Sequence, residues 1–127
     1  MKTILGISAF YHDSAACILI DGKIVAAAQE ERFTRIKHDA AYPHNAIEFV
    51  LEFSKLKLSE VDNIIFFEKP FLKFERLIET YVAFAPKGFL SFSKAIPVWI
   101  REKLFQKNLL FNNLKKHDAD FKNEEKI

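Results

Sequence analysis

The sequence predicts an α/β fold built on a mixed sheet of βββαβ type, followed by an added helical segment. Three observations indicate this fold. Three short apolar runs follow one another early in the chain, an Asp-Gly pair separates two of them, and an amphipathic stretch precedes a fourth apolar run. Short connections favour antiparallel neighbours, whereas an intervening helix permits a crossover to a parallel strand.

The first three strands are expected at residues 2–9, 15–20 and 23–29. Asp21-Gly22 between apolar runs is a strong signal for a β-hairpin. Because the first and third strands both run antiparallel to the second, their carboxyl ends share one edge of the sheet. The second and third strands are apolar throughout, so we expect both faces of the sheet to be covered.

The next elements follow from spacing and composition. Residues 30–44 are polar and basic and indicate a loop, and an apolar stripe over residues 45–53 predicts a helix. Residues 63–67 form the expected fourth strand. Pro70 suits the first turn of a helix, and the apolar spacing that follows predicts a helix over residues 70–84.

The carboxyl-terminal part of the chain is expected to be helical and then polar. A second helix of this segment is expected from about Phe89 and a third over residues 97–110. The expected organisation is a βββαβ core at residues 1–67, a helical insert at 68–111, and a charged tail at 112–127 that is flexible or solvated.

The composition excludes several classes of protein. The chain has 127 residues, half of them hydrophobic, which is enough for one domain with a core. The formal charge of +2 gives no general footprint for nucleic acid. No run approaches the about 20 apolar residues of a membrane span. The single cysteine, Cys17, lies in an apolar run and is typical of a small core residue, so we expect a cytoplasmic protein without an internal disulfide.

One group of residues with possible chemistry is His12-Asp13-Ser14, between the first two strands. A histidine transfers protons near neutral pH, an aspartate orients it, and a serine hydroxyl donates to a phosphate or carbonyl oxygen. The alternative is a solvated turn in which Asp13 or Ser14 binds local backbone groups. Three contiguous residues do not form a Ser-His-Asp catalytic triad.

The second group is the charged segment 29–39 at the end of the third strand. The strand directions bring this segment to the same edge as His12, so we expect His12 and residues 30–32 to line one cleft. The planar guanidinium of Arg32 suits phosphate or carboxylate. The alternative is an ordinary charged loop.

Two further features leave several interpretations open. No two of the four histidines are spaced i, i+4, so we expect no zinc site, and His117-Asp118 is expected to be solvated. The phenylalanine-rich segment 66–111 fits core packing of a helical insert, a face that docks on another domain or partner, or attachment to a membrane surface.

Residues 4–51 closely resemble the amino terminus of the O-carbamoyltransferases of nodulation-factor and antibiotic biosynthesis. The motifs that carry the resemblance are the HDSAA turn, the DG hairpin, the AxxEERFTRxKHD stretch and the Tyr42-Pro43 pair that follows. The resemblance is strong over residues 3–67 and loose over 68–127.

The resemblance implies a fold of the actin/Hsp70/sugar-kinase type, with a ribonuclease H-like motif. It implies transfer of a carbamoyl group from carbamoyl phosphate to a hydroxyl of a small molecule, through a carbamoyl-adenylate made with ATP. A carboxyl-terminal domain makes the adenylate in this family, and an HHxxHAxSA motif holds iron or another divalent metal.

This sequence contains neither the HHxxHAxSA motif nor the adenylate-forming domain. We therefore expect an amino-terminal fragment that ends before the metal motif, is inactive alone, and self-associates through exposed apolar surface. Two other functions remain open: a non-catalytic nucleotide-binding or regulatory module of the same superfold, and an interaction module that docks through its phenylalanine-rich helices.

The family motifs also imply roles for individual residues. His12 is the expected general base on the acceptor hydroxyl. Asp13 is expected to be the second catalytic residue, and Ser14 to bind the carbamoyl donor. Glu31 and Arg32 are expected to line the substrate cleft, and no residue of the chain is expected to bind a metal.

Overall fold

The computed structural model describes residues 1–68, 70–101, 105–122 and 126. The chain forms two compact units. The first comprises Met1–Phe67 and Leu110–Ile127 and contains the sheet, and the second comprises Glu68–Leu109 and is helical.

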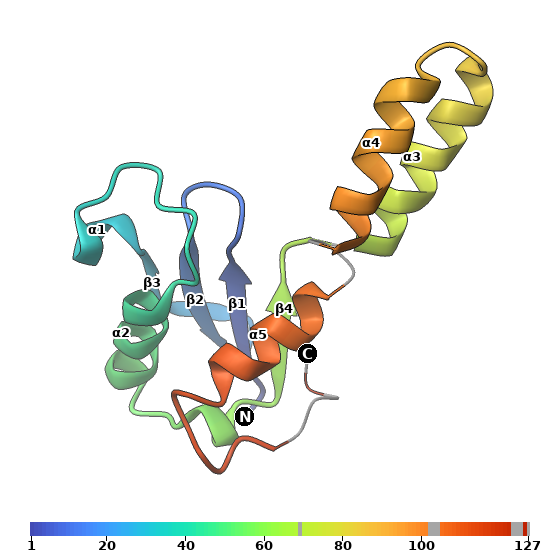
Figure 1. Cartoon of the computed structure of the whole chain (residues 1–127). Helices are drawn as coiled ribbons and strands as arrows, with labels where there is room; N and C mark the ends of the chain where they lie inside the picture. Colours follow the sequence, from blue (N-terminus) through green and yellow to red (C-terminus); the bar gives the residue numbers. More distant parts are fainter. Residues whose placement is uncertain (69, 102–104, 123–125, 127) are drawn as a thin grey trace. The chain divides into compact units, whose positions relative to one another are not determined.

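The first unit contains a four-stranded mixed sheet (Figure 1). Its strands are β1 (Thr3–Ser8), β2 (Ala15–Ile20), β3 (Lys23–Gln29) and β4 (Asn63–Phe66), in the order β3-β2-β1-β4. Strands β1–β2 and β2–β3 pair antiparallel, whereas β1 and β4 pair parallel. The predicted βββαβ arrangement is confirmed.

Two local features explain how the meander closes. Asp21 and Gly22 have φ angles of 49° and 80°, the left-handed pair that a tight hairpin turn requires, so the predicted hairpin is confirmed. Gly6 pairs with Cys17 on β2, and a Cβ at Gly6 would lie 2.8 Å from the Cys17 Sγ. A glycine at this position therefore leaves room for the cysteine side chain.

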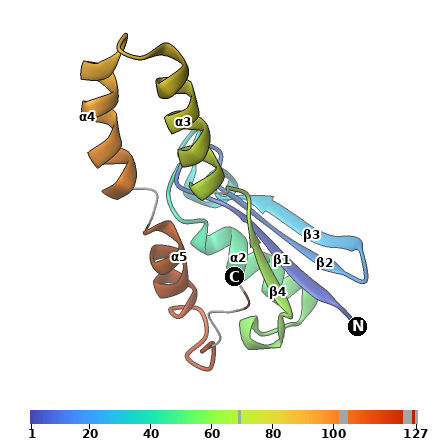
Figure 2. The same ribbon diagram turned by 90° about the vertical axis from the view of Figure 1, so that its right-hand side faces the viewer.

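Helices cover one face of the sheet (Figure 2). α2 (His44–Ser54) makes the crossover from β3 to β4, with the short η1 (Leu58–Glu60) after it. α2 buries a stripe consisting of Ala46, Ile47, Val50 and Leu51. Leu110 and Leu114 of α5 (Gln106–Leu114) are also buried in this core. The segment 30–44, which was expected to be a loop, contains the one-turn helix α1 (Glu31–Thr34).

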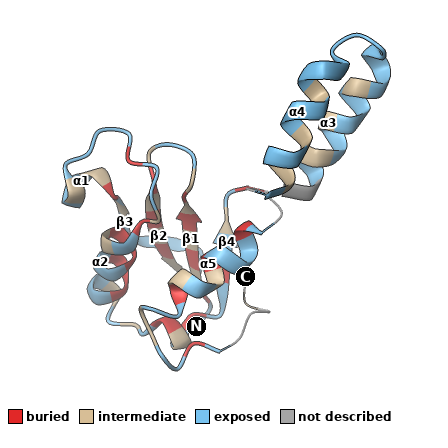
Figure 3. Ribbon diagram, viewed as in Figure 1, coloured by how far each residue is buried: buried red, intermediate tan, exposed pale blue. Residues whose placement is uncertain are grey.

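The opposite face of the sheet carries exposed apolar side chains of the first unit, and Figure 3 colours each described residue by its burial. Ile24 is 69% exposed, and Ile65 and Phe67 are about half exposed. A groove of about 770 Å³ on this face is lined by Cys17, Ala27, Ile65 and Phe67 among others. Within the first unit, helices pack on one face of the sheet only, so the expected cover on both faces is not formed within that unit.

The described part of the charged tail packs against the core, so the expectation of a solvated tail is wrong. Leu114 and Phe121 are fully buried, and the Phe121 ring lies 5.8 Å from that of Phe111. The Asp118 carboxylate accepts a hydrogen bond from the Ser59 amide at 3.0 Å. A few buried apolar residues, widely spaced along a mostly polar segment, are enough to pack that segment against the core. Residues 123–125 and 127 of the expected tail lie outside the described chain.

The second unit contains α3 (Pro70–Phe84) and α4 (Phe89–Trp99), joined by aromatic contacts. The rings of Tyr81 and Phe92 stack with centroids 4.0 Å apart, and those of Phe74 and Trp99 at 4.9 Å.

The helix expected over residues 97–110 is wrong in its boundaries. Pro97 lies inside α4 rather than at a helix start, and α5 begins at Gln106. Residues 102–104 of that expected helix lie outside the described residues. No helix in the described part of the chain has the length and apolarity to cross a membrane.

Candidate functional site

The loop between β1 and β2 is held by contacts rather than by turn residues. Phe10 and Asp13 have φ angles of 66° and 52°, a region that costs a non-glycine residue about 1–2 kcal/mol. The Phe10 amide donates to the Ala40 carbonyl at 3.0 Å, and the Ser14 amide donates to the Asp39 carbonyl at 2.8 Å. This pairing with the loop after α1 explains why the turn needs no glycine.

The Asp13 side chain contacts one histidine from each of the two motif segments, His12 in the turn after β1 and His38 in the charged segment after β3. Its Oδ2 lies 2.7 Å from the His12 Nδ1, and its Oδ1 lies 2.9 Å from the His38 Nδ1. The expectation that His12 and the charged segment after β3 share one edge is confirmed by this bridge. All three side chains are accessible, with the His12 side chain 58% and the His38 side chain 63% exposed.

The bridge decides where each imidazole carries its proton. An ionised carboxylate only accepts hydrogen bonds, so both histidines donate from Nδ1 and the Nε2 of a neutral ring keeps its lone pair. The hydrogen bonds from His38 and then His12 lower the pKa of Asp13. The hydrogen bond and charge of Asp13 raise the pKa of His38.

The remaining predicted site residues lie in different surroundings. The Glu31 Oε2 accepts a hydrogen bond from the His38 amide at 3.2 Å, so Glu31 belongs to the same cluster. Arg32 instead lines the groove on the open sheet face, together with Phe33 and Phe49. The single cleft expected for His12 and residues 30–32 is therefore divided: Glu31 lies with the histidines, and Arg32 lies in the groove.

Ser14 lies beneath the surface and is 1% exposed. Its amide donates to Asp39, its carbonyl accepts from the Glu30 amide at 2.8 Å, and its Oγ has no hydrogen-bond partner among the described residues. A direct contact between the Ser14 hydroxyl and a substrate does not fit this burial. Its backbone joins the end of β3 to the loop at residues 38–40.

Two acidic residues of the EERFTRxKHD stretch have structural contacts. The buried Glu30 carboxylate accepts from the Asn45 amide at 3.1 Å and the Ala46 amide at 2.8 Å, so it satisfies the amino-terminal end of α2. The Asp39 carboxylate accepts from the Thr34 hydroxyl at 2.8 Å and the Ala41 amide at 2.9 Å. These contacts fix the loop that carries His38.

Sequence reasoning assigned no role to His38, and it missed the contacts of His117. The only sequence signal for His38 is its place in the charged segment, because its partner Asp13 lies 25 residues away. The prediction of a solvated His117 is wrong: it is partly buried, and its ring stacks on that of His44 with centroids 4.3 Å apart.

The cluster of His12, Asp13 and His38 has the chemistry of a proton acceptor with an adjacent cation. A carboxylate that accepts from Nδ1 stabilises the imidazolium formed when Nε2 takes a proton. The raised pKa of His38 favours its protonated form, which attracts a negatively charged group.

Two of the known proteins that this chain resembles differ in their identity and in the share of each chain that is matched. The chain is 57% identical over 110 residues to uncharacterized protein sll1178 of Synechocystis, covering 87% of this chain and 18% of that protein. It is 41% identical over 58 residues to nodulation protein NolNO of Sinorhizobium fredii, covering 46% of this chain and 8% of that protein. The matched region is therefore less than a fifth of either relative's length.

A sequence profile described as carbamoyltransferase N-terminus matches residues 3–126. That match includes every residue of the His12–Asp13–His38 cluster and both units of the fold. The chain belongs to the carbamoyltransferase N-terminus family.

Proposed function

We propose that this chain forms the amino-terminal part of an O-carbamoyltransferase. Such an enzyme moves a carbamoyl group from carbamoyl phosphate, through a carbamoyl-adenylate made with ATP, to a hydroxyl of a small molecule. The family match and the nodulation relative support this activity. The mixed sheet order agrees with the opening of an actin/Hsp70-type, ribonuclease H-like domain. Since the relatives are several times longer, we propose that this chain alone is inactive.

The observation that carries the proposal is the Asp13 bridge between two accessible imidazoles. In the proposed step, the His12 Nε2 accepts the proton of the acceptor hydroxyl while its oxygen bonds to the carbamoyl carbon. The bond from that carbon to the phosphate oxygen of the adenylate breaks, and AMP leaves with the bonding electrons. Asp13 stabilises the resulting imidazolium, and protonated His38 attracts the departing phosphate.

The other predicted residues support this step in different ways. Glu31 positions His38, because the Glu31 carboxylate accepts a hydrogen bond from the backbone amide of His38. We propose that Arg32 contacts an anionic or polar part of the substrate from the groove. Ser14 acts through its backbone rather than through its buried hydroxyl. The HHxxHAxSA ligands that the resemblance implies for iron are not in this sequence, so no step is assigned to that metal.

The test is the variant His12→Ala in the full-length carbamoyltransferase that carries this segment. Loss of a general base is expected to lower carbamoyl transfer to the acceptor by about 10²–10⁴-fold. Formation of carbamoyl-adenylate from ATP and carbamoyl phosphate is expected to continue. The two activities are measured separately, as carbamoylated product by mass spectrometry and as pyrophosphate release.

Lys23→Ala is the control, because Lys23 is exposed at the opposite end of the β2–β3 hairpin and is expected to leave both activities unchanged. Full transfer activity in His12→Ala would remove His12 from the mechanism. If the wild-type enzyme transferred a carbamoyl group to none of the hydroxyl compounds tested, the proposed function itself would be contradicted.

A further inference from the structure

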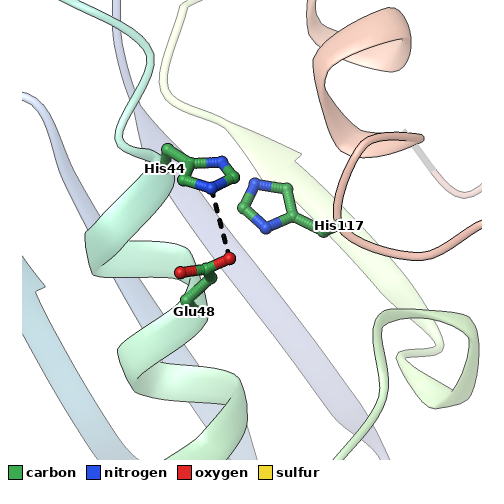
Figure 4. A group of neighbouring side chains, drawn as sticks. All are labelled: His44, Glu48 and His117. Atoms are coloured by element: carbon green, nitrogen blue, oxygen red, sulfur yellow. Dashed lines mark ion pairs between the residues drawn. The ribbon is translucent and has the colours of Figure 1, made fainter.

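A second cluster of ligand-type side chains shares no residue with the Asp13 bridge (Figure 4). His44 and Glu48 are one turn apart on α2, and His117 follows α5. The His44 Nε2 and the Glu48 Oε1 are 3.2 Å apart. Each of the three residues offers one possible metal-ligand atom, and these three atoms lie within 4.8 Å of one another. The cluster thus joins two segments that are distant in the sequence.

The surroundings of His117 are unusual for a histidine without a ligand. Both ring nitrogens are buried, and neither has a hydrogen-bond partner among the described residues. The ring stacks on His44 and lies 5.7 Å from that of Tyr42. Buried polar atoms are nearly always paired, so two unpaired nitrogens on one ring require an explanation.

The charge state of His117 also suits a metal ligand. Burial first, and then the neighbouring His44, lower the pKa of His117 to about 4, against the opposing effect of Glu48 and Glu30. The ring is therefore neutral at neutral pH and has a nitrogen lone pair available. Metal coordination requires this neutral form.

We propose that His44, Glu48 and His117 form a binding site for a divalent transition-metal ion of the zinc class. Two imidazoles and one carboxylate are a ligand set that zinc uses in proteins. Bonds of about 2.0–2.1 Å in a tetrahedral site separate the ligand atoms by about 3.4 Å. The pair on α2 already meets this spacing, and rotation of the His117 ring out of its stack brings the third atom in.

Three protein ligands leave a fourth position open. The cluster borders a groove of about 520 Å³ whose lining includes Glu48, Glu52, Lys57, His117 and Asp118. The Asp118 carboxylate already accepts hydrogen bonds from the amides of Ser59 and Asp120. Water or an external ligand in this groove therefore completes the coordination, and the metal ties the segment after α5 to α2.

This proposal departs from the expectation that no residue of the chain binds a metal. That expectation rests on the lack of histidine pairs at helical spacing and on the single cysteine, which lies in a strand. Here the helical pair is a histidine and a glutamate, and the third ligand comes from a distant segment. The site is also distinct from the HHxxHAxSA ligands of the family, which this sequence does not contain.

The test is titration of the chelator-treated chain with Zn²⁺ by calorimetry and with Co²⁺ by visible absorption. We expect one ion per chain and the intense Co²⁺ bands of a four-coordinate site. His44→Ala and Glu48→Gln are each expected to weaken binding at least tenfold. Both side chains are about half exposed, so these variants keep the fold even if His117→Ala does not.

Glu79→Gln is the control, since it changes an exposed carboxylate on α3 that is not part of the groove lining, and it is expected to leave binding unchanged. Unchanged binding in both His44→Ala and Glu48→Gln would overturn the proposal. So would loss of binding in Asp13→Asn alone, because the ion would then occupy the His12–Asp13–His38 cluster. Absence of any stoichiometric binding would overturn it as well.

Discussion

Asp13 contacts both His12 and His38, and the second of these lies 25 residues further along the chain. The motif spacing predicts that the two segments share an edge of the sheet, because parallel strands end on the same side. It does not predict which side chain bridges them, since that depends on the left-handed conformation at Asp13 and on the loop held by Asp39. At the residue scale, the sequence does not predict that Asp13 contacts both His12 and His38.

The bridge predicts the titration of His38. The pKa of His38 is raised above the ordinary value of 6.5. The contribution of this shift to the stability of the fold is therefore complete below pH 6.5, and it is lost as the pH rises through the pKa of the folded chain. The lowered pKa of Asp13 stabilises the fold above pH 3.8, and this contribution is lost as the pH falls through the folded pKa. Asp13→Asn is expected to lower the pKa of His38, as measured by NMR.

Lys23→Ala is the control for this titration, because the exposed Lys23 is expected to leave the pKa of His38 unchanged. An identical His38 midpoint in the wild-type chain and in Asp13→Asn would show that the bridge is not formed in solution.

At the scale of elements, Glu30 connects the end of β3 to the start of α2. Its carboxylate accepts from the first free amides of the helix and from the Asn45 side chain at 2.6 Å. α2 in turn makes the crossover to β4 and carries His44 and Glu48. The buried Glu30 therefore sets the position of the helix on which the second cluster lies.

We predict that Glu30→Ala lowers the free energy of unfolding by about 1–3 kcal/mol, because it leaves buried amides of α2 without an acceptor. Urea denaturation measures this change. Glu52→Ala removes an exposed carboxylate from the same helix and is expected to change stability by less than about 0.5 kcal/mol. Equal stability of the two variants would argue against the capping role of Glu30.

The strands and the boundaries of α5 differ in how far the sequence predicts them. The strands follow from local signals, namely short apolar runs and the Asp21-Gly22 turn. Pro97 predicts a helix start, since proline lacks the amide that a helix interior uses. α4 nevertheless includes it close to its carboxyl end, where only the last turn is affected.

At the scale of the whole molecule, the segment after α5 belongs to the sheet unit. Its composition suggests solvation, yet Phe121 is 1% exposed and packs in the same core as Leu5 and Ile18. Local composition does not report which distant surface an apolar residue covers. The open sheet face was missed for a related reason, because an apolar strand indicates that a face is suited to burial without identifying its cover.

We predict that Phe121→Ala lowers the free energy of unfolding by about 3–5 kcal/mol, the range for a fully buried phenylalanine. Lys122→Ala, at the exposed neighbouring position, is expected to have little effect. Urea denaturation of the two variants measures the difference. A Phe121→Ala chain as stable as the wild type would mean that the tail does not pack in solution.

The open sheet face and the second unit predict self-association of the isolated chain. Ile24, Ile65 and Phe67 are exposed on or near that face, and Leu90 of α4 is 75% exposed. Large exposed apolar surfaces favour association. Sedimentation velocity is expected to show a sedimentation coefficient that rises with protein concentration, and Ile65→Lys is expected to reduce this rise. A monomer at every concentration would contradict the prediction.

In the proposed transfer step, His12 accepts the proton of the acceptor hydroxyl. The most direct measurement is the single-turnover rate of carbamoyl transfer from preformed carbamoyl-adenylate, with wild-type and His12→Ala full-length enzyme. If His12 is the general base, the rate in the variant is expected to be lower by about 10²–10⁴-fold, with the adenylate still bound. A variant that transfers the carbamoyl group at the wild-type rate would contradict this role of His12.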